Sequence, residues 1–175
     1  SVLLSVIVVA DLFALPNGLA GAVLLLAGIS NLVRAVRWRI WVTWTTPLVW
    51  PLHLSYWSVA LGLILLGLVK LGVLTNVSMA IHTITVGGMG VMILAMISRV
   101  SLGHTGRFIE VGKVMTLAFV AIVLAMLVRV VAYWSAFDYQ VGLAVSAGLW
   151  ILAYGLFVIK YAPVLFRPRV DGGPG

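Results

Sequence analysis

The chain has no cysteine among its 175 residues. This excludes disulfides, thiolate metal sites, iron–sulfur clusters held by cysteine and covalent haem attachment through a CxxCH motif. A bound metal would need histidine, methionine or oxygen ligands. That donor set suits haem b or copper.

Charged residues are also scarce, at 9% of the chain, whereas soluble domains carry about 25%. Hydrophobic residues make up 63%, and the mean hydropathy is +1.22. Such a chain cannot cover a water-facing surface, so it belongs in a lipid bilayer. Its net charge of +7 comes from eleven cations spread between apolar segments, which form no face for nucleic acid. With only four acidic residues and no readable nucleophile–His–acid set, the sequence predicts no enzyme class.

Long apolar segments predict an all-α integral membrane protein with six transmembrane helices, because an isolated strand cannot satisfy its backbone in lipid. The segments are about Val2–Leu15, Leu19–Val36, Pro47–Leu71, Ser78–Ser98, Gly112–Tyr133 and Gln140–Phe166. They give one transmembrane domain at 1–166 and an unstructured polar tail at 167–175. The first segment is short and opens at Ser1, from which we expect a truncated or processed start.

The cations are distributed unevenly between the two sides of the membrane. One side receives nine of the eleven: Arg34, Arg37, Arg39, Arg99, Arg107, Lys113, Lys160, Arg167 and Arg169. The other receives Lys70 and Arg129. The positive-inside rule therefore places the first side, with both termini, in the cytoplasm.

The segment from Arg99 to Arg107, RVSLGHTGR, is unusually polar for a loop between two spans. It combines Arg99, His104 and Arg107 with two glycines and two hydroxyls. Glycine turns expose N–H groups that cradle anions, and arginine pairs with carboxylate or phosphate. We expect this loop to bind an anion such as a haem propionate, a lipid phosphate or a soluble anion. The alternative is simple anchoring in the lipid headgroups.

Three histidines, His53, His82 and His104, are the candidate metal ligands. His53 lies near the cytoplasmic end of its span and His82 near the outer end of the next, so their depths differ by about 15 Å. His104 returns to the level of His53, which makes these two the better pair for one metal. His82 would need a partner from elsewhere. The alternative for each histidine is hydrogen bonding within the bundle or, for His104, solvation.

The fourth span carries a polar and sulfur-rich stripe at helical spacing: Ser78, His82, Thr85, Met89, Met92 and Met96. Soft sulfurs beside an imidazole could line a haem or copper(I) pocket, but methionine is more often a filler of the core. The glycines Gly87, Gly88 and Gly90 lie off this stripe and predict close helix packing.

Two charged residues, Asp11 and Arg129, lie about one turn from the outer ends of their spans. Unpaired charges are costly there, so we expect the two to meet or to pair with another segment. His82 lies at a similar depth, and the three predict an outer polar cluster. A structural ion pair is the simpler interpretation, and a proton or ligand path is the alternative.

The stretch from His82 to Arg107, HTITVGGMGVMILAMISRVSLGHTGR, closely resembles the signature of the NnrS family, most specifically in the hexamer LGHTGR. The segments Pro51–Trp57 and Ala10–Leu12 also resemble it. The resemblance implies a multi-pass protein of the bacterial inner membrane that binds haem and copper and is tied to nitric oxide metabolism and denitrification. It also implies functional roles for His82, Arg99, His104 and Arg107, and then for His53.

The resemblance has one large departure. Full members of the family have about twice as many spans, and their first half contains an HAHEM-like motif that this chain lacks. The chain therefore resembles the C-terminal half only. We expect it to work with a partner subunit or with the missing N-terminal half.

Three functions are compatible with these features. The first is a haem-binding membrane protein of nitric oxide or respiratory redox metabolism, with haem b held by His53, His82 or His104 and its propionates by Arg99 and Arg107. The second is a non-redox scaffold subunit of a larger membrane complex. The third is half of a transporter, with a path lined by Asp11, His82 and Arg129.

Overall fold

The computed structural model describes residues 16–43, 46, 48–133, 138–170 and 172, and within these ranges all regular structure is helical. Five of the described helices are long and apolar enough to span a membrane. They are α2 (Asn17–Arg37), α3 (Trp50–Lys70), the continuous helix Val77–His104, α6 (Lys113–Val131) and α7 (Tyr139–Leu165). These confirm the all-α membrane class. The sixth predicted span, Val2–Leu15, lies outside the described residues.

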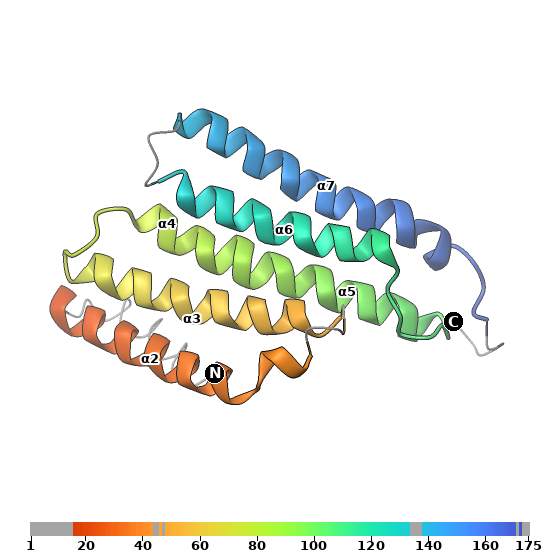
Figure 1. The fold of residues 1–175 in the computed structure, drawn as a ribbon, viewed down its shortest axis with the longest axis horizontal. Coiled ribbons are helices and arrows are strands. Elements are labelled where there is room, and N and C mark those ends of the chain that lie inside the picture. The colour runs from red at the N-terminus through yellow and green to blue at the C-terminus, as the bar shows by residue number, and fades with distance from the viewer. Residues whose placement is uncertain (1–15, 44–45, 47, 134–137, 171, 173–175) are drawn as a thin grey trace.

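The described helices run alternately up and down in a row (Figure 1). Neighbours in the sequence are neighbours in space: α2 packs on α3, α3 on the continuous helix, that helix on α6, and α6 on α7. Helices α2 and α7 therefore occupy opposite edges. Buried side chains concentrate between α3, the continuous helix and α6, where Phe119, Leu94 and Ile122 are fully enclosed.

Glycines allow the helices to approach one another this closely. A Cβ on Gly28 of α2 would lie 2.5 Å from Ile64 Cγ1 of α3, and one on Gly88 would lie 2.6 Å from Val59 Cγ2. The predicted packing role of Gly87 and Gly88 is thus confirmed, because both face α3 at distances that leave no room for a side chain.

The continuous helix is longer than the sequence predicted. Its 28 residues, Val77–His104, span about 42 Å, whereas the hydrocarbon core is about 30 Å thick. A helix of this length either tilts within the apolar layer or extends past it. Arg99 to His104 belong to this helix, so the prediction that RVSLGHTGR is entirely a loop is wrong. Only the end of the motif leaves the helix, from the cap at Thr105 and the left-handed Gly106 (φ +69°) onward.

The same helix is interrupted by a π-helical segment of eight residues, Thr83–Gly90, between α4 (Val77–His82) and α5 (Val91–His104). Such segments are rare and are frequently found at functional sites. The hydroxyl of Tyr154 on α7 donates to the Gly90 carbonyl oxygen at 3.0 Å. This bond fixes the end of the segment against α7.

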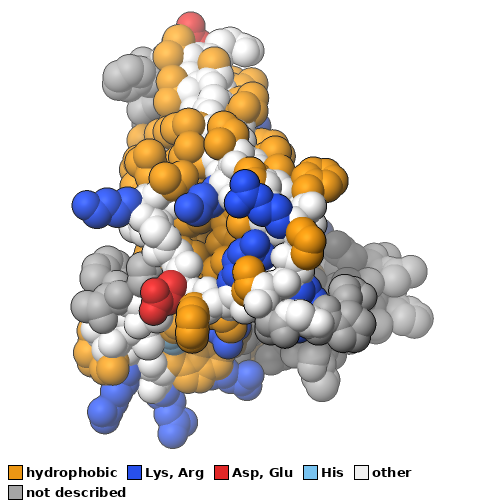
Figure 2. All heavy atoms as spheres, turned by 90° about the vertical axis from the view of Figure 1, so that its right-hand side faces the viewer, with side chains coloured by type: hydrophobic (Ala, Val, Ile, Leu, Met, Phe, Trp, Pro, Cys, Tyr) orange, Lys and Arg blue, Asp and Glu red, His pale blue; other side chains and the backbone are white. Residues whose placement is uncertain are grey.

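Basic side chains gather at the helix ends that lie on the right-hand side of Figure 1 and face the viewer in Figure 2. Arg37 ends α2 and Lys113 begins α6, whereas Arg99 and Lys160 each lie five residues before the last residue of α5 and α7. The uneven charge distribution read from the sequence is therefore a property of the folded molecule. The cytoplasmic assignment of this end stays a prediction.

The tail after α7 also makes a contact that the sequence did not predict. The backbone N–H of Val170 donates to the Thr105 carbonyl oxygen at 3.3 Å. Residues just beyond α7 thus return to the end of α5.

Candidate functional site

A polar cluster centred on His82 lies at the other ends of the helices, away from the basic side chains. Nε2 of His82 lies 3.1 Å from Nη2 of Arg129 on α6, and Nδ1 lies 2.6 Å from the Ser78 carbonyl oxygen. Arginine is always a donor, so Nε2 must accept, and the ring proton must lie on Nδ1. His82 is therefore a neutral imidazole whose Nδ1–H donates to backbone and whose Nε2 lone pair faces Arg129.

Two tyrosines close the cluster: Tyr133, just beyond α6, and Tyr139, the first residue of α7. The hydroxyl of Tyr133 donates to Ser78 Oγ at 2.6 Å, and it lies 3.4 Å from the hydroxyl of Tyr139. The guanidinium carbon of Arg129 lies 5.9 Å from the ring centroid of Tyr133 and 5.7 Å from that of Tyr139, within cation–π range.

This environment changes the acidity of Tyr133. Burial raises its pKa, but the hydrogen bonds with Ser78 and Tyr139 and the positive charge of Arg129 outweigh burial. The net result is a pKa of Tyr133 below its ordinary value of 10.0.

A cavity of about 390 Å³ adjoins the cluster. Its walls come from the continuous helix, α6 and α7: His82, Val86, Arg129, Leu143, Ser146, Ala147, Trp150 and Ile151. The hydroxyl of Ser146 donates to the Ala125 carbonyl oxygen at 2.8 Å and ties α7 to α6 here. The cavity thus combines apolar walls with an imidazole and a guanidinium.

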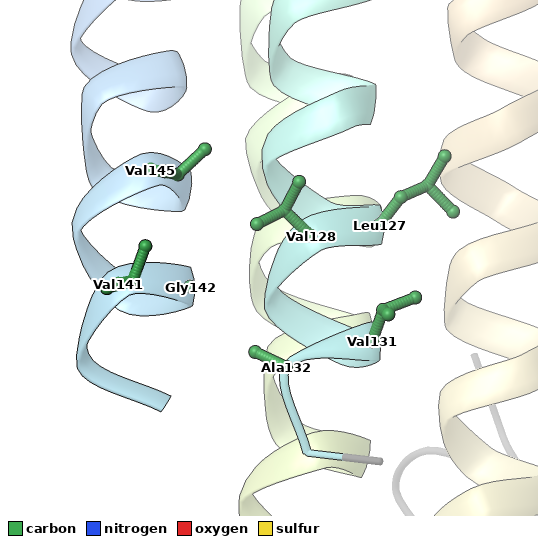
Figure 3. A pocket seen from close by; sticks show the side chains of 7 residues that line it. All are labelled: Leu127, Val128, Val131, Ala132, Val141, Gly142 and Val145. Atoms are coloured by element: carbon green, nitrogen blue, oxygen red, sulfur yellow. The ribbon is translucent and has the colours of Figure 1, made fainter. Parts of the chain in front are cut away.

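A second cavity, of about 370 Å³, lies between α6 and the start of α7. Figure 3 shows Val128 and Ala132 of α6 pointing toward Val141 and Val145 of α7. Leu127, Val131 and Gly142 complete its lining. These residues offer no polar side chain, so the cavity suits an apolar group and carries no chemistry.

The other predicted ligands lie at the far end of the helices. His53 sits in the first turn of α3 with its ring centroid 6.1 Å from that of Trp38, and its buried Nδ1 has no hydrogen-bond partner. Trp57, one turn further along, has an unpartnered Nε1 as well. The structure places His104 in an exposed position at the end of α5. The proposed pairing of His53 with His104 stays a prediction.

The two arginines of the motif differ in environment. Arg99 is exposed, whereas Arg107 is half-buried and its Nη1 lies 3.5 Å from the carbonyl oxygens of Thr105 and Val164. Arg107 therefore binds the last turn of α7 to the end of α5. Arg99 lies about 26 Å along the helix from His82, which is too far to serve the propionates of a haem bound at His82.

The methionine stripe faces outward. Met89, Met92 and Met96 are 55%, 38% and 43% exposed, so they do not fill the described core. Among the described residues, no group of three or more His, Cys, Asp or Glu side chains is close enough to hold a metal ion. A metal here would need a ligand set of fewer than three such residues, or ligands from outside the described ranges.

Sequence reasoning placed His82 and Arg129 in one outer cluster, and the structure brings them together. In the sequence prediction Tyr133 is only the end of a span, and Ser146 and Trp150 have no role. Tyr133 follows Arg129 by four residues, and Trp150 follows Ser146 by four. This spacing puts each pair on one helical face and is a signal that could have found them. Asp11, the expected partner of Arg129, lies outside the described residues.

Together, the fold and the site define a polytopic helical membrane protein with a histidine–arginine site at one membrane boundary. A family model for the NnrS protein matches residues 1–169. The chain belongs to the NnrS family. No curated protein and no solved structure matched the chain.

Proposed function

We propose that this protein is a haem-binding membrane protein connected with nitric oxide metabolism, and that His82 is the residue that would hold haem b. The observation that supports this proposal most directly is the tautomer of His82, which its hydrogen bonds fix. Its Nδ1–H donates to the Ser78 carbonyl oxygen, and its Nε2 lone pair borders the 390 Å³ cavity region. Metal-bound histidines almost always donate their other ring N–H in this way.

The residues around His82 fit such a group. Val86, Trp150 and Ile151 supply apolar walls, and Nη2 of Arg129 is the group that must shift for Nε2 to face an iron. Haem, when bound, supplies an iron that can take a diatomic ligand or exchange one electron. The protein would hold the imidazole in place through the Ser78 carbonyl oxygen, keep water away with the apolar walls and supply the positive charge of Arg129.

Copper is a second candidate cofactor, at the opposite end of the helices. His53 has a buried Nδ1 without a partner, and His104 belongs to the family signature. These two residues are the proposed contributors to such a site, with Arg107 holding the adjacent loop. The five apolar helices and the family membership support a membrane protein with several spans, and we propose that its location is the bacterial inner membrane.

The test is the absorption spectrum of the protein purified from membranes. We expect a Soret band that His82→Ala removes and His104→Ala keeps, because only His82 lies at the cavity. Thermal unfolding of each variant is the control for folding. A colourless wild-type protein, or a Soret band unchanged in a folded His82→Ala variant, would contradict the proposal and favour the scaffold function.

Copper is tested separately by elemental analysis after dialysis against the metal. We expect His53→Ala and His104→Ala each to lower the bound copper, and His82→Ala to leave it unchanged. Equal copper in all three variants and the wild type would contradict this assignment.

A further inference from the structure

Arg129 has more hydrogen-bonding capacity than its described neighbours use. Nη2 donates to His82, but Nε and Nη1 are buried and have no hydrogen-bond partner. A buried charged donor without a partner is costly, because its desolvation is not compensated by a hydrogen bond. Both atoms are closed to a water-sized molecule, so an acceptor reaches them only when the guanidinium turns toward the cavity that Arg129 lines.

The charge of Arg129 is balanced only in part. Within the described ranges it contacts the rings of Tyr133 and Tyr139 and an imidazole that the hydrogen bonds show to be neutral. Aromatic faces and neutral nitrogens stabilise a cation less than an anion does. The electrostatics thus favour a negative group beside the guanidinium.

The cavity beside Arg129 has room for such a group and for an apolar body. Its volume of about 390 Å³ lies within the range of about 300–1,000 Å³ typical of small-molecule sites. Apart from His82, Arg129 and Ser146, its walls are apolar, and the Ser146 hydroxyl already donates to Ala125. The guanidinium is therefore the group in this lining that can hold an anionic head.

We propose that this cavity binds an amphiphilic carboxylate, with the carboxylate on Arg129 and the apolar part against Val86, Leu143 and Ile151. The inference goes beyond haem binding, because it requires no metal. The same chemistry could come from a free amphiphile or from a haem propionate. The haem-free protein distinguishes these two sources.

Trp150 lines the cavity and provides a reporter. The haem-free protein in zwitterionic nanodiscs is titrated with 8-bromooctanoate, whose bromine quenches indole fluorescence on contact, and with 8-bromooctan-1-ol as the neutral match. We expect saturable quenching by the carboxylate and only weak, linear quenching by the alcohol. Trp150→Phe should remove the saturable component.

Two variants test the site from different sides. Arg129→Gln should weaken binding at least tenfold, whereas Lys70→Gln, a change of the other cation on this side, should leave it unchanged. Ala147→Phe should also abolish saturable binding, because Ala147 is exposed, lines the cavity and can fill it without touching Arg129. Ala144→Phe, on the same helix but outside the lining, is its matched control.

Three outcomes would overturn the proposal. The first is equal quenching by acid and alcohol in the wild type, and the second is saturable binding that survives both Arg129→Gln and Ala147→Phe. The third is binding seen only with haem present or only in Asp11→Asn, since a propionate or the Asp11 carboxylate would then be the native partner of Arg129. Loss of the Soret band in His82→Ala with intact carboxylate binding would separate this site from haem binding.

Discussion

The backbone carbonyl of Ser78 determines what the His82 side chain can do. This oxygen accepts the hydrogen bond from Nδ1–H, so Nε2 carries the only available lone pair of the ring nitrogens. Arg129 uses this lone pair in the present structure. The iron of the proposed haem would therefore compete with the guanidinium for this lone pair, and the hydrogen bond from Nδ1 supports either partner.

Tyr154 offers a residue-level test of the π-helical segment. Tyr154→Phe removes the hydroxyl that donates to the Gly90 carbonyl oxygen and leaves that oxygen without the bond. We expect a loss of about 0.5–1.5 kcal/mol in the free energy of unfolding, the usual net value of such a bond. Reversible unfolding in detergent measures it, and an unchanged midpoint would show that the segment holds its shape without Tyr154.

Individual residue roles were only partly predictable. The cost of burying charge indicated that Arg129 needs a partner, and helical depth indicated His82 as a candidate. The sequence could not show that Tyr133 and Tyr139 would stack on the same guanidinium, because that depends on how the α6–α7 connection folds back. Nor could it show that Arg107 would bind the carbonyl oxygen of Val164, which is 57 residues away.

At the level of elements, composition predicted the helices well and their interruptions poorly. The bounds of α6 and α7 differ from the predicted spans by one or two residues at each end. Hydropathy reports length and burial, so it found these spans. It carries no information on hydrogen-bond register, and the π-helical segment Thr83–Gly90 was therefore missed.

The contact between α2 and α3 gives a prediction at this scale. Gly28→Leu should destabilise the protein by about 1–3 kcal/mol, because its side chain would meet Ile64 and the Ala60 carbonyl oxygen at 2.5 and 2.9 Å. Gly148→Leu on α7 is the matched control, since its Cβ would meet nothing within 4 Å. Thermal unfolding compares them. Equal midpoints would mean that α2 does not need to approach α3 this closely.

At the level of the whole molecule, the basic end carries Arg34, Arg37, Arg99, Lys113 and Lys160, and the opposite end carries the His82 site. If the basic end is cytoplasmic, the His82 cluster lies near the outer side of the membrane. A ligand would then reach it without crossing the bilayer. This orientation rests on charge and needs a direct measurement.

The absence of cysteine makes that measurement clean. Thr75→Cys, in the exposed α3–α4 connection, should react with a membrane-impermeant maleimide added to intact spheroplasts. Gly112→Cys, exposed before α6, should react only after the membrane is opened. The cysteine-free wild type is the blank. The reverse labelling pattern would invert the topology and place the His82 site in the cytoplasm.

The row of helices has a consequence for how the protein is made. Each described helix after α2 packs against the helix that precedes it: α3 on α2, the Val77–His104 helix on α3, α6 on that helix, and α7 on α6. A chain leaving the translocon could therefore assemble helix by helix, each new one settling against a neighbour already in the bilayer. The His82–Arg129 bond can form only once the fourth of these, α6, has entered, so the site is completed late in synthesis, on a scaffold already in place.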